Sequence, residues 1–143
     1  CRCTPEQVAR YQGKLSGPLL DRIDLHVEVA ALPAEELLAA PPGEVTAAVR
    51  ARCIAARERA LARQGHANQA LHGQAIDRHA RLDDAAARFL HTAAARLGWS
   101  ARATHRALKV ARTIADLAGS AGVGVAHVGE AVQYRRALKA ADS

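Results

Sequence analysis

The stretch DDAAARFLHTAAARLGWSARATHRALKVARTIADL, residues 83–117, decides the fold that this sequence predicts. Its apolar side chains recur every three or four positions, which is the period of an amphipathic helix. Asp83 and Ser100 are favourable N-cap residues, and each stands directly before one of the two periodic runs. A glycine lies between the runs, where it ends the first helix. The stretch therefore predicts two successive helices, 84–97 and about 101–117.

These two helices are expected to turn their apolar stripes inward. Beside the second stripe, Arg112 stands four positions before Asp116, a spacing that favours an ion pair on one helix face. We expect that pair to be structural. The inward positions are predicted to be Ala86, Phe89, Leu90, Ala93 and Leu97 in the first helix, and Ala103, Ala107, Val110, Ile114 and Leu117 in the second.

Further helices are predicted on both sides of this pair. A long helix covers 44–64 and is followed by a glycine, and a polar, histidine-rich loop with a short helix near 73–79 comes next. A last helix runs over about 125–138. The long helix carries an apolar stripe, which puts Cys53 in the core: Val45, Val49, Cys53, Ala56 and Ala60.

The first third of the chain has a different pattern. Residues 4–12 carry the signals of a capped helix, with a threonine cap and a proline and a glutamine in the first turn. Residues 25–29 alternate between apolar and polar side chains, which is the period of a half-buried strand. A short helix at 34–39 lies among prolines, and residues 31–43 are therefore expected to form a linker.

Composition limits what such a chain can be. It has 143 residues, half of them apolar but only 3% aromatic, with a net charge of +6. A core of Ala, Leu and Val favours helices. The positive charge suits nucleic acid, nucleotide phosphates or an acidic membrane surface, and it equally fits a solvated arginine-rich surface. The chain begins with cysteine and has no methionine, so we expect a piece of a longer protein.

Two further features bear on where the protein works. No apolar run approaches the roughly 20 residues of a membrane span, so no membrane partner is expected. The three cysteines are too few for a disulfide-rich secreted domain, which favours a reduced, cytoplasmic setting.

Residues 16–24, SGPLLDRID, place Arg22 at the end of a tight turn. A guanidinium is planar and permanently charged, so an arginine on such a turn can be presented across an interface to a neighbour's phosphate. The alternative is an ion pair within the chain, with Asp21 or Asp24 as the partner.

Four groups of residues resemble the AAA+ ATPases of the magnesium-chelatase-like group, and within it the branch that acts in bacterial competence. Together they span almost the whole chain in the family's order. They are CRCT at 1–4; LSGPLLDRIDL at 15–25; SAR at 100–102 with HR at 105–106; and VARTIADL at 110–117, followed by EA at 130–131 and QYRR at 133–136.

The resemblance implies a hexameric ring that uses ATP and Mg²⁺, binds branched DNA and drives branch migration in recombination during natural transformation. It also implies a mainly α fold, with a helical lid bundle of about four helices after a short helix-turn-strand remnant of an AAA+ α/β core. The core remnant is expected at 1–30, the linker at 31–43 and the lid at 44–143.

The resemblance assigns roles to three arginines. Arg22 falls on the arginine finger, a catalytic residue that acts in trans on a neighbouring subunit. Arg102 falls on the sensor 2 arginine, which contacts the ATP phosphates. It stands near a helix N-terminus, where partial positive charge favours anions. Arg106, one turn further on, is a second-rank candidate for the same site.

Several chemical features are missing from the sequence. The GxxxxGK[ST] phosphate loop and the acidic magnesium-binding strand are absent, so this chain alone is expected neither to hydrolyse ATP nor to hold a cofactor. Cys1 and Cys3 supply only two of the four ligands of a structural zinc site, so no metal is expected. The histidines show no metal-ligand spacing.

Two alternative functions remain open. A basic helical module would bind nucleic acid phosphates through arginines of the long helix, although few aromatic side chains are available for stacking. A motor subunit for inserting magnesium into a porphyrin is suggested only by the name of a related subunit. The arginines of the first alternative are Arg50, Arg57, Arg59 and Arg63.

Overall fold

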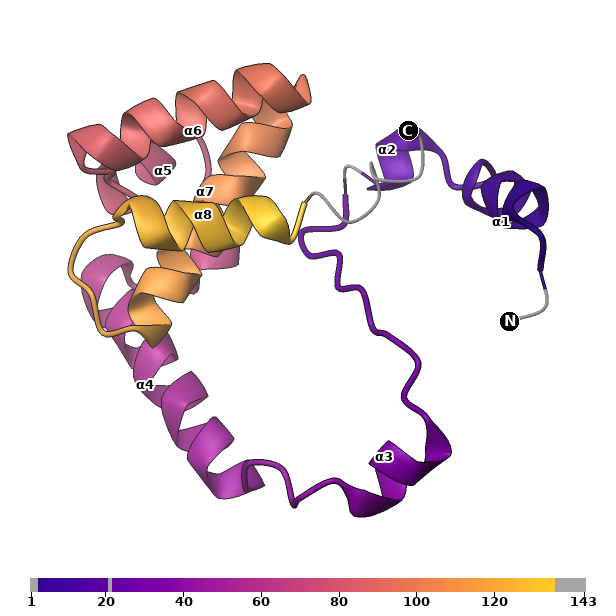
Figure 1. Ribbon diagram of the computed structural model, residues 1–143. Helices are drawn as coiled ribbons and strands as arrows, with labels where there is room; N and C mark the ends of the chain where they lie inside the picture. The colour runs from indigo at the N-terminus through magenta and orange to yellow at the C-terminus, as the bar shows by residue number, and fades with distance from the viewer. Residues whose placement is uncertain (1–2, 21, 136–143) are drawn as a thin grey trace.

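The computed structural model describes residues 3–20 and 22–135. Within these residues the chain is mainly α, as predicted, and it forms no strand; the one isolated bridge joins Leu82 and Val123. The helices, labelled in Figure 1, are α1 (Pro5–Gln12), α2 (Gly17–Leu20), α3 (Ala34–Ala39), α4 (Thr46–Gln64), the 3-10 turn η1 (Asn68–Ala70), α5 (Gln74–His79), α6 (Asp84–Leu97), α7 (Ala101–Leu117) and α8 (Val125–Gln133).

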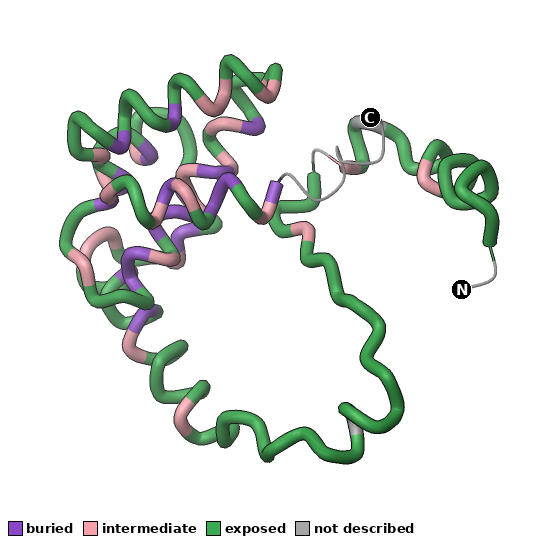
Figure 2. Tube along the Cα trace, in the orientation of Figure 1, coloured by how far each residue is buried: buried purple, intermediate pink, exposed green. Residues whose placement is uncertain are grey.

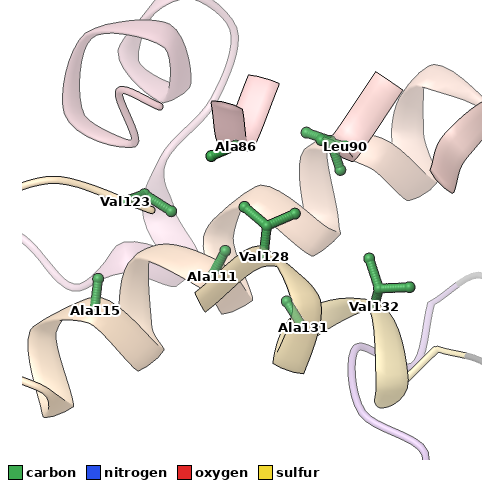
Figure 3. Close-up of a cluster of buried hydrophobic side chains, with 8 residues drawn as sticks. All are labelled: Ala86, Leu90, Ala111, Ala115, Val123, Val128, Ala131 and Val132. Carbon is green, nitrogen blue, oxygen red and sulfur yellow. The ribbon is translucent and has the colours of Figure 1, made fainter. Parts of the chain in front are cut away.

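A bundle of α6, α7 and α8 holds the main core, with α4 and α5 packed against α7. The core side chains are small, and Figure 3 shows them converging from the three helices. Small residues let helix axes approach closely and bury area without large side chains. The buried cluster consists of Ala86, Leu90, Ala111, Ala115, Val123, Val128, Ala131 and Val132.

The predicted caps of α6 and α7 are confirmed. The Asp83 carboxylate accepts the Ala86 amide at 2.7 Å, and the Ser100 hydroxyl accepts the Ala103 amide at 3.2 Å. Gly98 ends α6 with φ of 59°, a left-handed conformation that glycine adopts without strain. Each side-chain cap contributes about 1 kcal/mol, so local signals fix where these two helices begin.

Residues 3–45 form an arm that contains no buried residue among those whose burial the structure describes (Figure 2). The predicted capping box of α1 is present, with the Thr4 amide donating to the Gln7 side chain at 2.9 Å. In Figure 1 the arm begins with α1 and α2, passes close to the end of α8, continues through α3 and joins the bundle through α4. The arm is therefore held by local helices and by a few contacts at one point.

The predicted strand at 25–29 is wrong for the described chain. Val27 and Val29 are 67% and 86% exposed, and no second extended segment pairs with them. Alternation describes only how side chains would face a sheet, and a strand needs a neighbour for its backbone hydrogen bonds. The His26 amide instead donates to the Tyr134 carbonyl at 2.7 Å.

Five predicted core positions are exposed: Val45, Val49 and Cys53 in the first half of α4, Phe89 on α6, and Leu117 at the end of α7. Cys53 is exposed because the first half of α4 projects beyond α7, and only Ala56 and Ala60 of that helix are buried. Phe89, on α6, is 40% exposed. The last predicted helix, 125–138, ends earlier in the structure: α8 ends at Gln133 and a turn follows at 134–135, while Leu138 lies outside the described residues. The division at 1–30, 31–43 and 44–143 stays a prediction.

Candidate functional site

Arg22 follows α2 on a turn built from local hydrogen bonds. The Ser16 hydroxyl accepts the Leu19 amide at 3.3 Å, and the Arg22 amide donates to the Leu19 carbonyl at 3.0 Å. Arg22 itself is exposed. The turn therefore fixes the backbone of Arg22 while its guanidinium is open to an outside ligand.

The structure brings Arg22, Arg102 and Arg106 together around one hollow of about 450 Å³. Arg102 and Arg106 stand one turn apart on α7, and Lys109 continues their row, while Arg22 reaches the hollow from the arm. The remaining lining comes from α7 and from the segment around α5: His72, Gly73, Ile76 and His105.

An ion pair ties the arm to α7 beside this hollow. The Asp24 carboxylate lies 2.7 Å from Nε of Arg106, whose side chain is 24% exposed. The alternative partner that the sequence offered for Arg22 is thus engaged with Arg106, and Asp21 lies outside the described residues. Asp24 offsets one of the four positive charges that line the hollow.

Two further contacts attach the same part of the arm to the turn directly after α8. Nη1 of Arg135 donates to the Ile23 carbonyl at 3.3 Å, and the His26 amide donates to the Tyr134 carbonyl. The Arg135 guanidinium also lies 5.7 Å from the centre of the Trp99 ring, within cation–π range. The residues directly after Arg22 are therefore attached to the bundle.

The electrostatics of the hollow favour an anion. Its lining carries three guanidinium groups and one ammonium group, and Nζ of Lys109 donates to the Gln69 carbonyl at 3.0 Å. The nearby start of α7 adds the partial positive charge of a helix N-terminus. Planar guanidinium groups match phosphate oxygens with paired hydrogen bonds, so the arrangement suits a phosphate-bearing ligand.

Arg112 is structural, as predicted, and pairs with Asp116 at 3.0 Å with both side chains 1% exposed. Sequence reasoning missed the other partners of Asp116. Arg63 of α4 donates to both its carboxylate oxygens, at 2.6 and 2.9 Å, and Asn68 donates at 2.8 Å. No spacing in the sequence links these residues, because they meet only in the folded chain.

This cluster perturbs the Asp116 carboxyl. Burial raises its pKa, but the hydrogen bonds from Arg63 and Asn68 and the charge of Arg112 outweigh burial and hold the pKa below its usual value. Arg59 adds a hydrogen bond to the Asp116 carbonyl at 2.8 Å. The cluster therefore fastens α4 to the C-terminal half of α7.

The fold engages two of the four arginines proposed for a nucleic-acid module. Arg63 forms an ion pair with the Asp116 carboxylate, and Arg59, although exposed, donates to the Asp116 carbonyl, whereas Arg50 and Arg57 are exposed. Arg52 pairs with Glu44. The internal contacts reduce the charge that α4 can offer to phosphates.

Among the described residues, no group of three or more histidine, cysteine, aspartate or glutamate side chains is placed to hold a metal ion. Cys3 is exposed and Cys1 lies outside the described residues. None of the described helices combines the length and apolar character needed to cross a bilayer.

Two family profiles match this chain. "Magnesium chelatase, subunit ChlI C-terminal" matches residues 43–135, and "Magnesium chelatase, subunit ChlI" matches residues 1–37. The chain therefore belongs to the magnesium chelatase subunit ChlI family, within the AAA+ proteins.

Relatives cover nearly all of the chain. It is 43% identical over 139 residues to the competence protein ComM of Haemophilus influenzae, a match of 96% of this chain and 27% of ComM. It is 46% identical over 136 residues to the uncharacterized protein YifB of Salmonella typhimurium, covering 94% and 27%. An uncharacterized protein of Mycobacterium bovis is 41% identical over 140 residues, covering 95% and 28%. The chain thus spans about a quarter of the length of these relatives, and the resemblance to ComM and YifB is confirmed.

Proposed function

We propose that this chain supplies two cations, Arg22 as an arginine finger and Arg102 as sensor 2, to ATP bound by a neighbouring subunit of an AAA+ ring. The observation that carries the proposal is that both side chains line the same hollow although they are 80 positions apart. Because a finger acts in trans, a sensor 2 arginine beside it would act on the same neighbour's nucleotide. Arg106 and Lys109 would strengthen the field around the phosphates.

The physical reason lies in phosphoryl transfer. Negative charge spreads over the γ-phosphoryl oxygens in the transition state, and a guanidinium that arrives from a neighbour stabilises it. The 143 residues lack a phosphate loop, so ATP and Mg²⁺ would be bound by other parts of a longer protein. Hydrolysis would then depend on assembly, and this chain alone would be inactive.

On the larger scale, we infer a role in a hexameric ring that remodels branched DNA during recombination in natural transformation. The support is the similarity to ComM, whose name assigns it to competence. In this proposal residues 1–30 are the C-terminal end of the AAA+ α/β core, residues 31–43 are the linker, and residues 44–143 form the helical lid domain.

The test is Arg22→Ala in the longer protein that carries this sequence. We expect ATP hydrolysis to fall by about 10³-fold or more, while nucleotide binding stays within about twofold, because the finger contacts the neighbour's phosphate mainly in the transition state. Steady-state turnover and a fluorescent-nucleotide titration measure the two quantities. Arg88→Ala, an exposed arginine of α6, is the matched control, and retained hydrolysis in Arg22→Ala would refute the assignment.

A further inference from the structure

We propose that Asp24, Arg106 and Arg135 are positioning residues that latch the Arg22 turn onto α7 and onto the turn directly after α8. The latch comprises three contacts: Asp24 to Arg106 at 2.7 Å, Arg135 to the Ile23 carbonyl at 3.3 Å, and the His26 amide to the Tyr134 carbonyl at 2.7 Å. The role given to Arg22 rests on the proposed function. The existence of the latch rests on these three contacts and does not depend on that function.

The contacts follow Arg22 immediately in the chain. They involve positions 23, 24 and 26, and they reach two different elements: helix α7 through Arg106, and the turn directly after α8 through Tyr134 and Arg135. Attachment at two places restrains both the position and the direction of the segment, whereas a single contact would leave it free to pivot.

The rest of the arm supplies little restraint. None of its residues with described burial is buried, and the side chains on either side of the latch, Leu19 and Val27, are 45% and 67% exposed. Packing of this part of the arm against the bundle is limited to partly buried side chains such as that of His26, whose ring nitrogens are buried. The polar contacts add direction to this packing.

The positive charges around the hollow are a second reason why Arg22 needs to be held in place. Arg22, Arg102, Arg106 and Lys109 repel one another, and without ligand their repulsion favours moving Arg22 away. Asp24 opposes this in two ways, since it offsets the charge of Arg106 and attaches the next turn of the arm to it. The latch thereby keeps Arg22 and Arg102 together as one pair of cations before any phosphate arrives, which lowers the ordering cost of binding.

For Asp24→Asn, a positioning role and a purely electrostatic role predict opposite changes in the affinity for anions. Removing a carboxylate next to a cationic hollow should strengthen anion binding if only charge matters. If the carboxylate acts by positioning Arg22, its loss should weaken binding instead. Asp24 is about half exposed, so the bundle core is not disturbed by the substitution.

The experiment uses the 143-residue chain in two measurements. Solvent exchange of the His26 amide, followed by NMR, reports the latch, and an NMR titration with inorganic tripolyphosphate reports the site. We compare the unmodified chain, Asp24→Asn, Arg22→Ala and their combination. Asp24→Glu tests rescue by a retained charge, and Glu28→Gln removes a carboxylate from an exposed position of the same segment.

We expect Asp24→Asn to accelerate His26 exchange by about twofold to fivefold, the range for a partly exposed ion pair, and to weaken tripolyphosphate binding by a similar factor. In the Arg22→Ala background the substitution should no longer weaken binding, and Asp24→Glu and Glu28→Gln should behave like the unmodified chain. Unchanged exchange overturns the latch. Faster exchange with unchanged or stronger binding overturns the positioning role. If the unmodified chain binds no tripolyphosphate, the proposed function of the site and the positioning role fail together, and exchange alone then decides whether the latch exists.

Discussion

Asp116 shows how much a single buried carboxylate can organise. It accepts hydrogen bonds from Arg63, Asn68 and Arg112, which belong to α4, η1 and its own helix. Arg112 in turn donates to the carbonyls of Ser120 and Ala121, at 2.7 and 2.9 Å, so the cluster also fixes the turn after α7. One charge therefore joins four segments of the chain.

Asp116→Asn is expected to lower the free energy of unfolding by about 3 kcal/mol or more, because it leaves the buried Arg112 guanidinium without its counter-charge. Urea denaturation followed by circular dichroism at pH 7 measures the change. Asp77→Asn, at an exposed position of α5, is the control and should stay within about 0.5 kcal/mol. A similarly small change in Asp116→Asn would contradict the structural role.

The same residue predicts a pH dependence. The folded-state pKa of Asp116 lies below its unfolded value of about 3.9. Its contribution to stability is therefore fully present above pH 4 and is lost as the pH falls through the folded pKa. Unfolding free energies measured between pH 7 and pH 2 should show a smaller loss in Asp116→Asn than in the unmodified chain. Parallel curves would show that Asp116 does not contribute to acid unfolding.

At the scale of elements, α7 succeeds as a central helix because its buried face is made of alanines. Ala111 and Ala115 are fully buried, and they lie in one cluster with Val128 and Ala131 of α8. Among the described helices, α7 and α8 make the most extensive contact, and Figure 3 shows the side chains of this cluster. Larger side chains at these positions would separate the two helices.

Ala111→Leu is accordingly expected to destabilise the chain by about 1–3 kcal/mol through overpacking. Ala95→Leu adds the same atoms at an exposed position of α6 and should be nearly neutral. Thermal unfolding of the two variants beside the unmodified chain measures both effects. Equal melting temperatures for the two variants would show that the α7–α8 contact can expand.

The elements also show what the sequence could predict. α6 and α7 begin and end as predicted because Asp83, Ser100 and Gly98 act on the backbone within a few residues. The strand at 25–29 failed because a strand depends on a partner that no local pattern supplies. Periodicity likewise identified the apolar face of α4, but it carries no information on which half of that face meets α7, so Cys53 was misplaced.

The candidate site was predictable only in part, for the same reason. Arg22 and Arg102 were each singled out by a turn or a helix start and by family motifs, which are local signals. Their convergence depends on the attachment of residues 23–26 to α7 and to the turn directly after α8, and those partners lie about 80 to 110 positions away in the chain. Such contacts exist only once the bundle has formed.

At the scale of the whole molecule, basic charge is distributed between internal contacts and the surface. Because Arg59 and Arg63 are bound to Asp116, we expect the chain to bind DNA weakly. The dependence of the binding constant on salt should correspond to about two phosphate contacts. Fluorescence titrations with duplex and forked DNA at several salt concentrations measure this.

The variant Arg50→Ala with Arg57→Ala should weaken that residual binding and reduce its dependence on salt, because these two arginines are exposed on α4. Glu58→Ala on the same helix is the control for the loss of an exposed charged side chain. Tight binding that survives the double substitution would favour the independent nucleic-acid module over the ATPase proposal.

The contacts that attach α4 to α7 determine the order in which the helices unfold. Only two alanines of that helix are buried, and the remaining hold on α7 comes from the arginines bound to Asp116. The apolar core shared by α6, α7 and α8 contains no residue of α4. Acid protonates Asp116 and weakens these contacts while the apolar core is unaffected, so we expect α4 to open before the other helices. Its amides should then lose hydrogen-exchange protection while those of α7 keep it.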